Sequence, residues 1–278
     1  MTRWIMVGAV VSLAGAVGCD GTPQTIATAK PVSGGDVNKS AVQIAPGKAP
    51  AQSDPKAAEL IAAAVAAHTG GKPELLQKLK TVRYVREGKV SAGGLAEANQ
   101  KWEVHAGWPD RFRVRAEMLG QQVVTLVWSG TAGWRHATGL SKIPMTEQEV
   151  SDFRHEVTGE WLELLFPLTE PGAVVALAED AKVNNRPAGG VRVWHPSLSD
   201  AVLHFDKETR LLVRLAYDGR ETGQKVTKEV LVQSHKEFAG VKLPEQTVYK
   251  SNGAEFADWR LTAAEPLDKL DAKLFEEP

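Results

Sequence analysis

The chain has 278 residues, 43% hydrophobic and 24% charged, which is typical of a globular protein with ample material for a core. Its 33 basic and 34 acidic residues leave a net charge of −1, so it lacks the basic excess with which nucleic-acid-binding proteins contact phosphates. A single cysteine excludes a disulfide within the chain.

The N-terminus has the order of a secretory signal, with a positive charge, an apolar run and small residues. Arg3 precedes the apolar run 4–18, which is too short to span a bilayer comfortably and stops at Cys19. The box Ala16-Val17-Gly18-Cys19 resembles the cleavage site of bacterial lipoproteins. That resemblance implies that residues 1–18 are a signal peptide and that Cys19 carries the anchoring lipid. The alternatives are an ordinary signal peptide and a short anchor with an incidental cysteine.

Residues 19–53 follow as the lipidated N-terminus and a linker with hardly a large apolar side chain. Such a segment cannot bury enough surface to offset its conformational entropy, so we expect a flexible tether. The tether and the lipid predict a protein of the bacterial cell envelope that is anchored by lipid and faces the periplasm. Both the inner and the outer membrane remain open for the anchor.

The folded part is predicted to begin with a helix over residues 54–69. Asp54 is the N-cap, Pro55 opens the first turn and Gly70 ends the helix. The side of this helix expected to pack against a sheet comprises Ala58, Ile61, Ala62 and Val65. A short second turn leads into a first strand at 81–90.

A meander of antiparallel strands follows, predicted at 99–106, 111–118, 121–128 and 133–137. In the strand 111–118 charged and apolar residues alternate without a miss, so one face meets water and the other is dry. Arg111, Arg113 and Arg115 form the charged face, which could meet lipid phosphates but is better explained as a solvated face that discourages edge pairing.

A second helix is predicted over residues 146–166. It starts with a capping box at Thr146 and Glu149, and it ends at Phe166-Pro167. One apolar stripe runs along it, made of Val150, Phe153, Val157, Trp161 and Leu164. A helix of this kind, inserted in a run of strands, is expected to lie across the open face of the sheet.

The second half of the chain is predicted to be strand and turn only, with strands at 173–183, 191–195, 201–205, 210–217, 225–234, 245–250 and 255–262. Residues 184–190 are expected to form a loop, and Asp218-Gly219 is expected to begin a turn. Asn252-Gly253 is the strongest hairpin signal in the chain. No internal boundary divides residues 54–278, which we interpret as one domain.

The order helix, strand meander, crossing helix, strand meander resembles the periplasmic lipoprotein-carrier superfamily of the LolA and LolB type. The segments that carry the resemblance are FDKETRLL at 205–212, FAGVKLP at 238–244 and KLF at 273–275. The resemblance covers 54–278 and implies an α+β fold, an incomplete antiparallel β-barrel that wraps helices around an apolar cavity for acyl chains. A soluble carrier of this superfamily would lack Cys19. The layout of this chain is therefore closer to that of the membrane-tethered acceptor. That acceptor's exposed leucine loop has its nearest counterpart in Gly93-Gly94-Leu95, although a plain hairpin loop is the better explanation of those residues, because one exposed leucine is common.

The resemblance predicts a protein that holds acyl chains or lipoprotein by apolar burial, without a covalent step or a cofactor. The residues expected to line its cavity are Trp102, Val104, Phe112, Val114, Met118, Leu126, Trp128, Phe153, Val157 and Trp161. Tryptophans suit the walls of such a pocket, and they are equally suited to a plain core.

Two other classes of function can be weighed, and the second of them, an enzyme, is not expected. The first is a tethered envelope sensor or scaffold that binds a protein partner through the sheet. The second is an enzyme, but the chain has no Gly-x-Ser-x-Gly, phosphate-binding glycine loop or dinucleotide motif. The seven histidines lack zinc-site spacings, so no metal site is expected. A cluster of buried polar side chains at the cavity floor would favour an enzyme.

Overall fold

The computed structural model describes residues 48–91, 97–118 and 122–276. The predicted signal peptide, the lipid attachment site Cys19 and the loop Gly93-Gly94-Leu95 lie outside the described residues.

Thirteen strands of the described residues form one sheet in which all neighbours are antiparallel. They are β1 (Thr81–Val90), β2 (Ala98–Gly107), β3 (Arg111–Met118), β4 (Gln122–Ser129), β5 (Ala132–Ala137), β6 (Ile143–Pro144), β7 (Val174–Val183), β8 (Arg186–Trp194), β9 (Ala201–Asp206), β10 (Leu212–Glu221), β11 (Gln224–Phe238), β12 (Val241–Ser251) and β13 (Ala254–Pro266).

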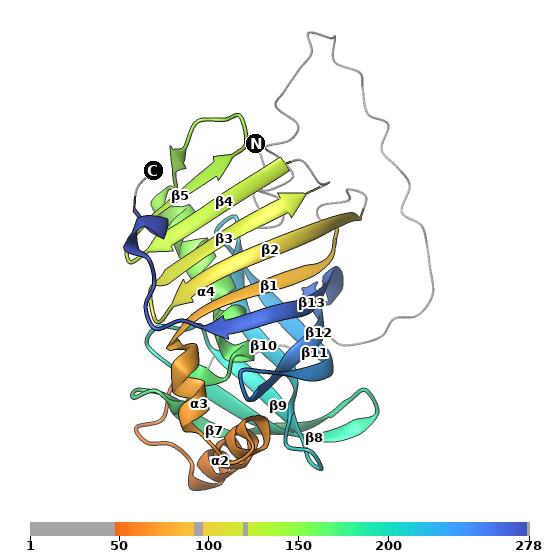
Figure 1. Ribbon diagram of the computed structural model, residues 1–278. Coiled ribbons are helices and arrows are strands. Elements are labelled where there is room, and N and C mark those ends of the chain that lie inside the picture. The colour runs from red at the N-terminus through yellow and green to blue at the C-terminus, as the bar shows by residue number, and fades with distance from the viewer. Residues whose placement is uncertain (1–47, 92–96, 119–121, 277–278) are drawn as a thin grey trace.

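The sheet curves but does not close. Its order is β6-β5-β4-β3-β2-β1-β13-β12-β11-β10-β9-β8-β7, so β6 and β7 are the two edges and the first and last strands pair in the middle. The chain passes from one edge to the other through helix α4, which lies behind β1–β4 in Figure 1. The predicted fold class, α+β with an incomplete antiparallel barrel wrapping helices, is confirmed.

The helices are α2 (Pro55–Thr69), α3 (Glu74–Gln77) and α4 (Glu147–Glu163), with the short 3₁₀ helices η2 (Lys78–Lys80), η3 (Phe166–Thr169) and η4 (Ala272–Leu274). Their predicted caps are present. The Asp54 carboxylate accepts hydrogen bonds from the backbone of Lys56 and Ala57, and Thr146 and Glu149 form the capping box of α4. Sequence signals therefore placed both long helices correctly at their first residues.

The buried side of α2 differs from the prediction. Ala57, Ile61, Ala64, Val65 and His68 are buried, whereas the predicted Ala58 and Ala62 are exposed. Helix α2 packs against β7, β8 and β12 of the second half of the sheet through its buried side. There His68 accepts a hydrogen bond from the backbone of Leu212 (2.9 Å) and bonds the carbonyl of Lys242, so this histidine belongs to the core.

Two predicted turns in the second half are strand instead. Residues 186–190 belong to β8, because Asn184 and Asn185 alone make the turn, both with positive φ (49° and 65°). Asp218-Gly219 lies within β10, which continues to Glu221. Gly219 is needed there because a Cβ would lie 2.6 Å from Cγ of Lys228, whose side chain crosses it.

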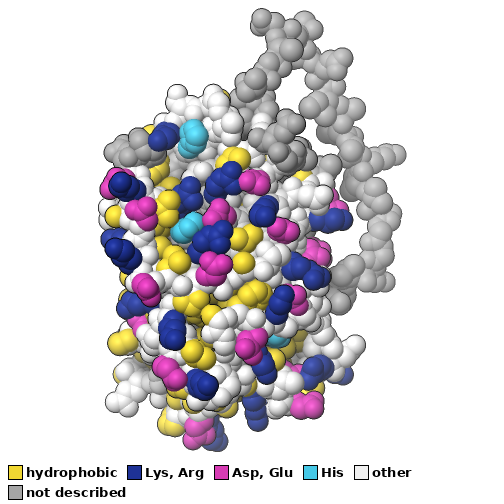
Figure 2. Space-filling model, viewed as in Figure 1, with side chains coloured by type: hydrophobic (Ala, Val, Ile, Leu, Met, Phe, Trp, Pro, Cys, Tyr) yellow, Lys and Arg dark blue, Asp and Glu magenta, His cyan; other side chains and the backbone are white. Residues whose placement is uncertain are grey.

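The two faces of the sheet differ in chemistry. On β3 the arginines and Glu117 point outward, while Phe112, Val114, Ala116 and Met118 are buried on the concave side. Figure 2 shows basic and acidic side chains interspersed over the outer face of β1–β5. Ion pairs between neighbouring strands, such as Arg83 with Glu103 and Lys101 with Glu87, are part of this face. Such a mixed surface stays in water, and the core lies on the other side.

Candidate functional site

The ten side chains predicted to line a cavity come together on the concave face. Seven lie on β2, β3 and β4, and three lie on the side of α4 that faces them. All ten are buried in one apolar cluster, which we call the apolar layer: Trp102, Val104, Phe112, Val114, Met118, Leu126, Trp128, Phe153, Val157 and Trp161. Phe153 and Trp161 of α4 contact Phe112 and Trp128 within this layer, and none of the ten lines any of the three pockets described below.

Aromatic rings fill the contact between α4 and the sheet. Phe153 lies edge-on to Phe112 and Trp128, with ring centroids 5.9 and 6.5 Å apart, and Trp161 packs against Trp108 at 5.3 Å. Rings at these separations contribute about 0.5–1.5 kcal/mol per pair beyond their burial. Helix α4 therefore occupies the space that a ligand bound to the apolar layer would need.

Next to the apolar layer, the C-terminal half of α4 meets the sheet through charged groups. Arg86 of β1 donates to Glu160 (3.3 Å) and to Glu163 (3.1 Å), and Tyr84 donates to Glu160 at 2.5 Å. Tyr249 of β12 donates to Glu163. We call these five residues the buried charge cluster, because each is at most 7% exposed.

A second pair of carboxylates extends this polar zone along β10 and β11. The ammonium group of Lys228 lies 2.8 Å from Glu221 and 3.3 Å from Glu156, and Lys228 is 1% exposed. Four carboxylates thus meet two cations in the interior. Burial, together with the neighbouring Glu160, raises the pKa of Glu163 to about 7, although Arg86 acts in the opposite direction. Burial likewise raises the pKa of Glu156.

Sequence reasoning missed these charged groups, although a signal was present. Glu156, Glu160 and Glu163 stand at positions i, i+4 and i+7, which places them on one helix face, where they resemble a solvated stripe. The cluster is the feature that would favour an enzyme, but its groups bond one another. None of its members lines the three pockets described here. The arrangement fixes α4 on the sheet.

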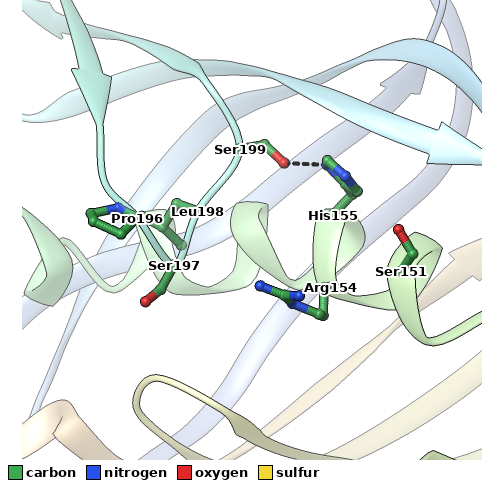
Figure 3. A pocket seen from close by; sticks show the side chains of 7 residues that line it. All are labelled: Ser151, Arg154, His155, Pro196, Ser197, Leu198 and Ser199. Carbon is green, nitrogen blue, oxygen red and sulfur yellow. Dashed lines mark hydrogen bonds between the residues drawn. The ribbon is translucent and has the colours of Figure 1, made fainter. Parts of the chain in front are cut away.

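A small polar pocket lies on the outer side of α4, against the loop between β8 and β9 (Figure 3). We call it the serine pocket; its lining residues are Ser151, Arg154, His155, Pro196, Ser197, Leu198 and Ser199. The His155 Nδ1 atom lies 2.5 Å from the Ser199 hydroxyl, which suggests a nucleophile beside a base.

The hydrogen bonds of His155 contradict that interpretation. Its Nε2 atom accepts from Nε of Arg220 at 3.1 Å, and an arginine is always protonated. Burial and Arg220 also lower the pKa of His155, so the ring is neutral at pH 7 with its proton on Nδ1. The imidazole therefore donates to Ser199 and cannot remove the serine proton, as a catalytic base must.

An open apolar cavity of about 410 Å³ lies between α2, η3 and the start of β7. We call it the α2 cavity; it is lined by Ser53, Ala58, Ile61, Ala62, Val65, Ala66, Pro73, Leu168, Thr169, Ala173 and Val175. Ile61, Val65, Leu168 and Val175 belong to the same buried cluster as the apolar layer. The volume is in the usual range for small-molecule sites, about 300–1,000 Å³. Ala58 and Ala62, which the sequence predicts to pack against the sheet, thus face a cavity.

Two further searches cover the described residues only. They contain no group of three or more histidine, cysteine, aspartate or glutamate side chains arranged to hold a metal ion. No helix among them is both long and apolar enough to cross a bilayer.

No family model matches the chain, and no curated protein matches it. Solved structures that resemble it include a LolA superfamily protein from Nitrosomonas europaea, with 12% identity and a TM-score of 0.49 over 76% of this chain and 98% of that one. A putative outer membrane lipoprotein-sorting protein domain from Vibrio parahaemolyticus has 10% identity and a TM-score of 0.44 over 73% and 94%. A DUF1329 family protein from Desulfovibrio piger has 13% identity and a TM-score of 0.49 over 80% of this chain and 96% of that one. These likenesses concern the fold alone.

Proposed function

We propose that this protein is a lipid-anchored envelope protein that binds acyl chains, of a lipoprotein or of another apolar ligand, inside its half-barrel, and so takes part in lipoprotein or lipid sorting. The observation that supports the proposal most is the continuity of the interior. An unclosed sheet carries one apolar cluster on its concave face, and that cluster reaches solvent at the α2 cavity. Cys19 supplies the membrane anchor in this proposal.

Apolar burial is enough to hold such a ligand. Each methylene group removed from water contributes about 0.8 kcal/mol before the cost of immobilising the chain is subtracted. The α2 cavity is already open, so it takes the acyl chain first. The apolar layer beneath α4 is the deeper part of the site in this proposal, and access to it requires α4 to separate from the sheet and break the bonds of the buried charge cluster.

Two matched tryptophan substitutions test the proposal. Ala62 lines the α2 cavity, whereas Ala63 is exposed on the same helix and does not line it. Full-length protein carrying Cys19→Ser, so that any added acyl mass is non-covalent, is exposed to phospholipid and weighed by native mass spectrometry. We expect Ala62→Trp to reduce the lipid-bound fraction at least tenfold and Ala63→Trp to leave it within twofold. No bound lipid in the parent protein, or equal binding in all three, would contradict the proposal.

The alternative is a tethered scaffold that binds a protein partner through the outer face of the sheet. The packing of α4 onto the apolar layer favours the scaffold. The outer face of the sheet is free of α4, so a partner can bind there without any rearrangement. Crosslinking in the envelope separates the two functions. A stoichiometric protein partner that Ala62→Trp retains and Arg113→Glu loses would support the scaffold.

A further inference from the structure

The serine pocket has a volume of about 130 Å³, roughly that of four water molecules at about 30 Å³ each. Figure 3 shows its side chains approaching from two elements: Ser151 and Arg154 from α4, and Ser197 and Ser199 from the loop before β9. The guanidinium group of Arg154 points toward the loop residue Ser197 (Figure 3). A space of this size suits a small polar group and excludes an acyl chain.

The pocket gathers hydrogen-bond donors that have no acceptor. Ser199 accepts from Nδ1 of His155, so its own hydroxyl proton is left for another group. Within the described part of the chain, the hydroxyl groups of Ser151 and Ser197 make no hydrogen bond. Arg154 has no carboxylate partner there either, and its guanidinium carbon lies 5.9 Å from the ring of Trp128. Arg154, which is exposed, and Ser199 thus face this space with unused donors, whereas Figure 3 shows the hydroxyl group of Ser197 pointing away from Arg154.

The nearest carboxylates are already engaged. Asp152 accepts hydrogen bonds from the side chain of Gln148 (2.8 Å) and from the backbone of Gly223 (2.9 Å). Asp200 accepts from Arg192 at 2.7 Å. The Arg220 side chain adds positive charge on the far side of the imidazole of His155. Unused donors and positive charge at this pocket favour a ligand that is rich in acceptors and negatively charged.

We propose that the serine pocket binds a phosphate-type anion, with the Arg154 guanidinium and the hydroxyl group of Ser199 as donors. Two sources offer this chemistry, inorganic phosphate and a phospholipid headgroup. The position of Arg154 beside Trp128, a member of the apolar layer, fits a headgroup held at the rim of the acyl site. The headgroup form of the proposal rests on the proposed function, and the phosphate form does not.

The first experiment titrates full-length protein with inorganic phosphate by isothermal titration calorimetry. We expect Arg154→Gln to weaken binding at least tenfold, as the loss of a charge-assisted hydrogen bond predicts, and Ser199→Ala to weaken it severalfold. Arg111→Gln is the matched control, because Arg111 is exposed on β3 and the charge change is identical. Circular dichroism confirms that each variant is folded.

The second experiment compares a short-chain phosphatidic acid with the diacylglycerol of equal chain length. If Arg154→Gln weakens the binding of phosphatidic acid but not that of the diacylglycerol, the pocket binds a phospholipid headgroup. Phosphate binding that depends on Arg154, without any lipid binding, supports the pocket and counts against the proposed function. The pocket proposal is overturned if neither phosphate nor phosphatidic acid binding depends on Arg154, or if Arg111→Gln weakens both equally.

Discussion

Glu163 is a carboxyl group in a place where ionisation is unfavourable. It is 1% exposed and faces Arg86, Tyr249 and Glu160 in the buried charge cluster. Its pKa rises from the ordinary 4.5 to about 7, so the folded state holds this proton more tightly than the unfolded state. The stability gained from the proton is complete below about pH 4.5 and is lost as the pH rises through 7.

We therefore expect Glu163→Gln to change how stability depends on pH. The neutral amide cannot ionise, so the unfolding free energy of the variant should improve relative to the parent by up to about 3 kcal/mol between pH 5 and pH 8. Urea denaturation across this range measures the difference. Glu147→Gln, on the exposed first turn of the same helix, is the control and should run parallel to the parent. A parallel curve for Glu163→Gln as well would contradict the placement of Glu163.

At the scale of elements, the fit of α4 against β10 depends on a glycine. A Cβ at Gly159 would lie 2.8 Å from ring atoms of Tyr217, which is itself fully buried. Glycine ordinarily costs a helix about 1 kcal/mol relative to alanine. Helix propensity alone would therefore make Gly159 a weak point of the helix, whereas the structure gives it a packing role.

Gly159→Ala should destabilise the protein by about 1–3 kcal/mol despite the better helix propensity of alanine, because the added methyl group overpacks the contact with Tyr217. Chemical denaturation of a double-mutant cycle checks this. In a Tyr217→Leu background the same substitution should be neutral or stabilising, because the ring is gone. Stabilisation by Gly159→Ala alone would show that α4 is not held as closely as described.

What the sequence predicts at this scale depends on the range of the interaction. The caps of α2 and α4 and the Asn252-Gly253 hairpin are made within a few residues, so local patterns identify them. The buried face of α2 and the partners of Glu160 and Glu163 depend on strands more than 70 residues away, as the sequence separations show. The same helical spacing of carboxylates fits a solvated face and a buried cluster, and only the partner strand decides between them.

At the scale of the whole molecule, the proposed anchor should control where the protein resides. If Cys19 carries the lipid, Cys19→Ser in the native host should move the protein from the membrane fraction to the soluble fraction, because the apolar attachment is lost. Fractionation with immunodetection measures the shift. A protein that stays with the membrane after the substitution would point to another anchor and would contradict the lipid at this position.

The overall architecture and the ten residues of the apolar layer are predictable because strand alternation and one helical stripe already specify a dry face. Whether that face holds a ligand or a helix is a matter of packing, which periodicity does not encode. The serine pocket escaped the prediction for a related reason. Ser151 and Ser199 are 48 positions apart in the sequence and meet only because the β8–β9 loop folds onto α4.

The pairing of β1 with β13 at the centre of the sheet also sets the order of events during synthesis. The ribosome makes β1 early. Its neighbour β13 begins only at Ala254, after residues 91–253 have been added. At about 5–20 residues per second, the hydrogen-bonding groups along that side of β1 wait for roughly ten to thirty seconds. During that time the nascent chain exposes an unpaired strand edge, which can aggregate. Chaperones that prevent aggregation are therefore needed most before β13 has been made.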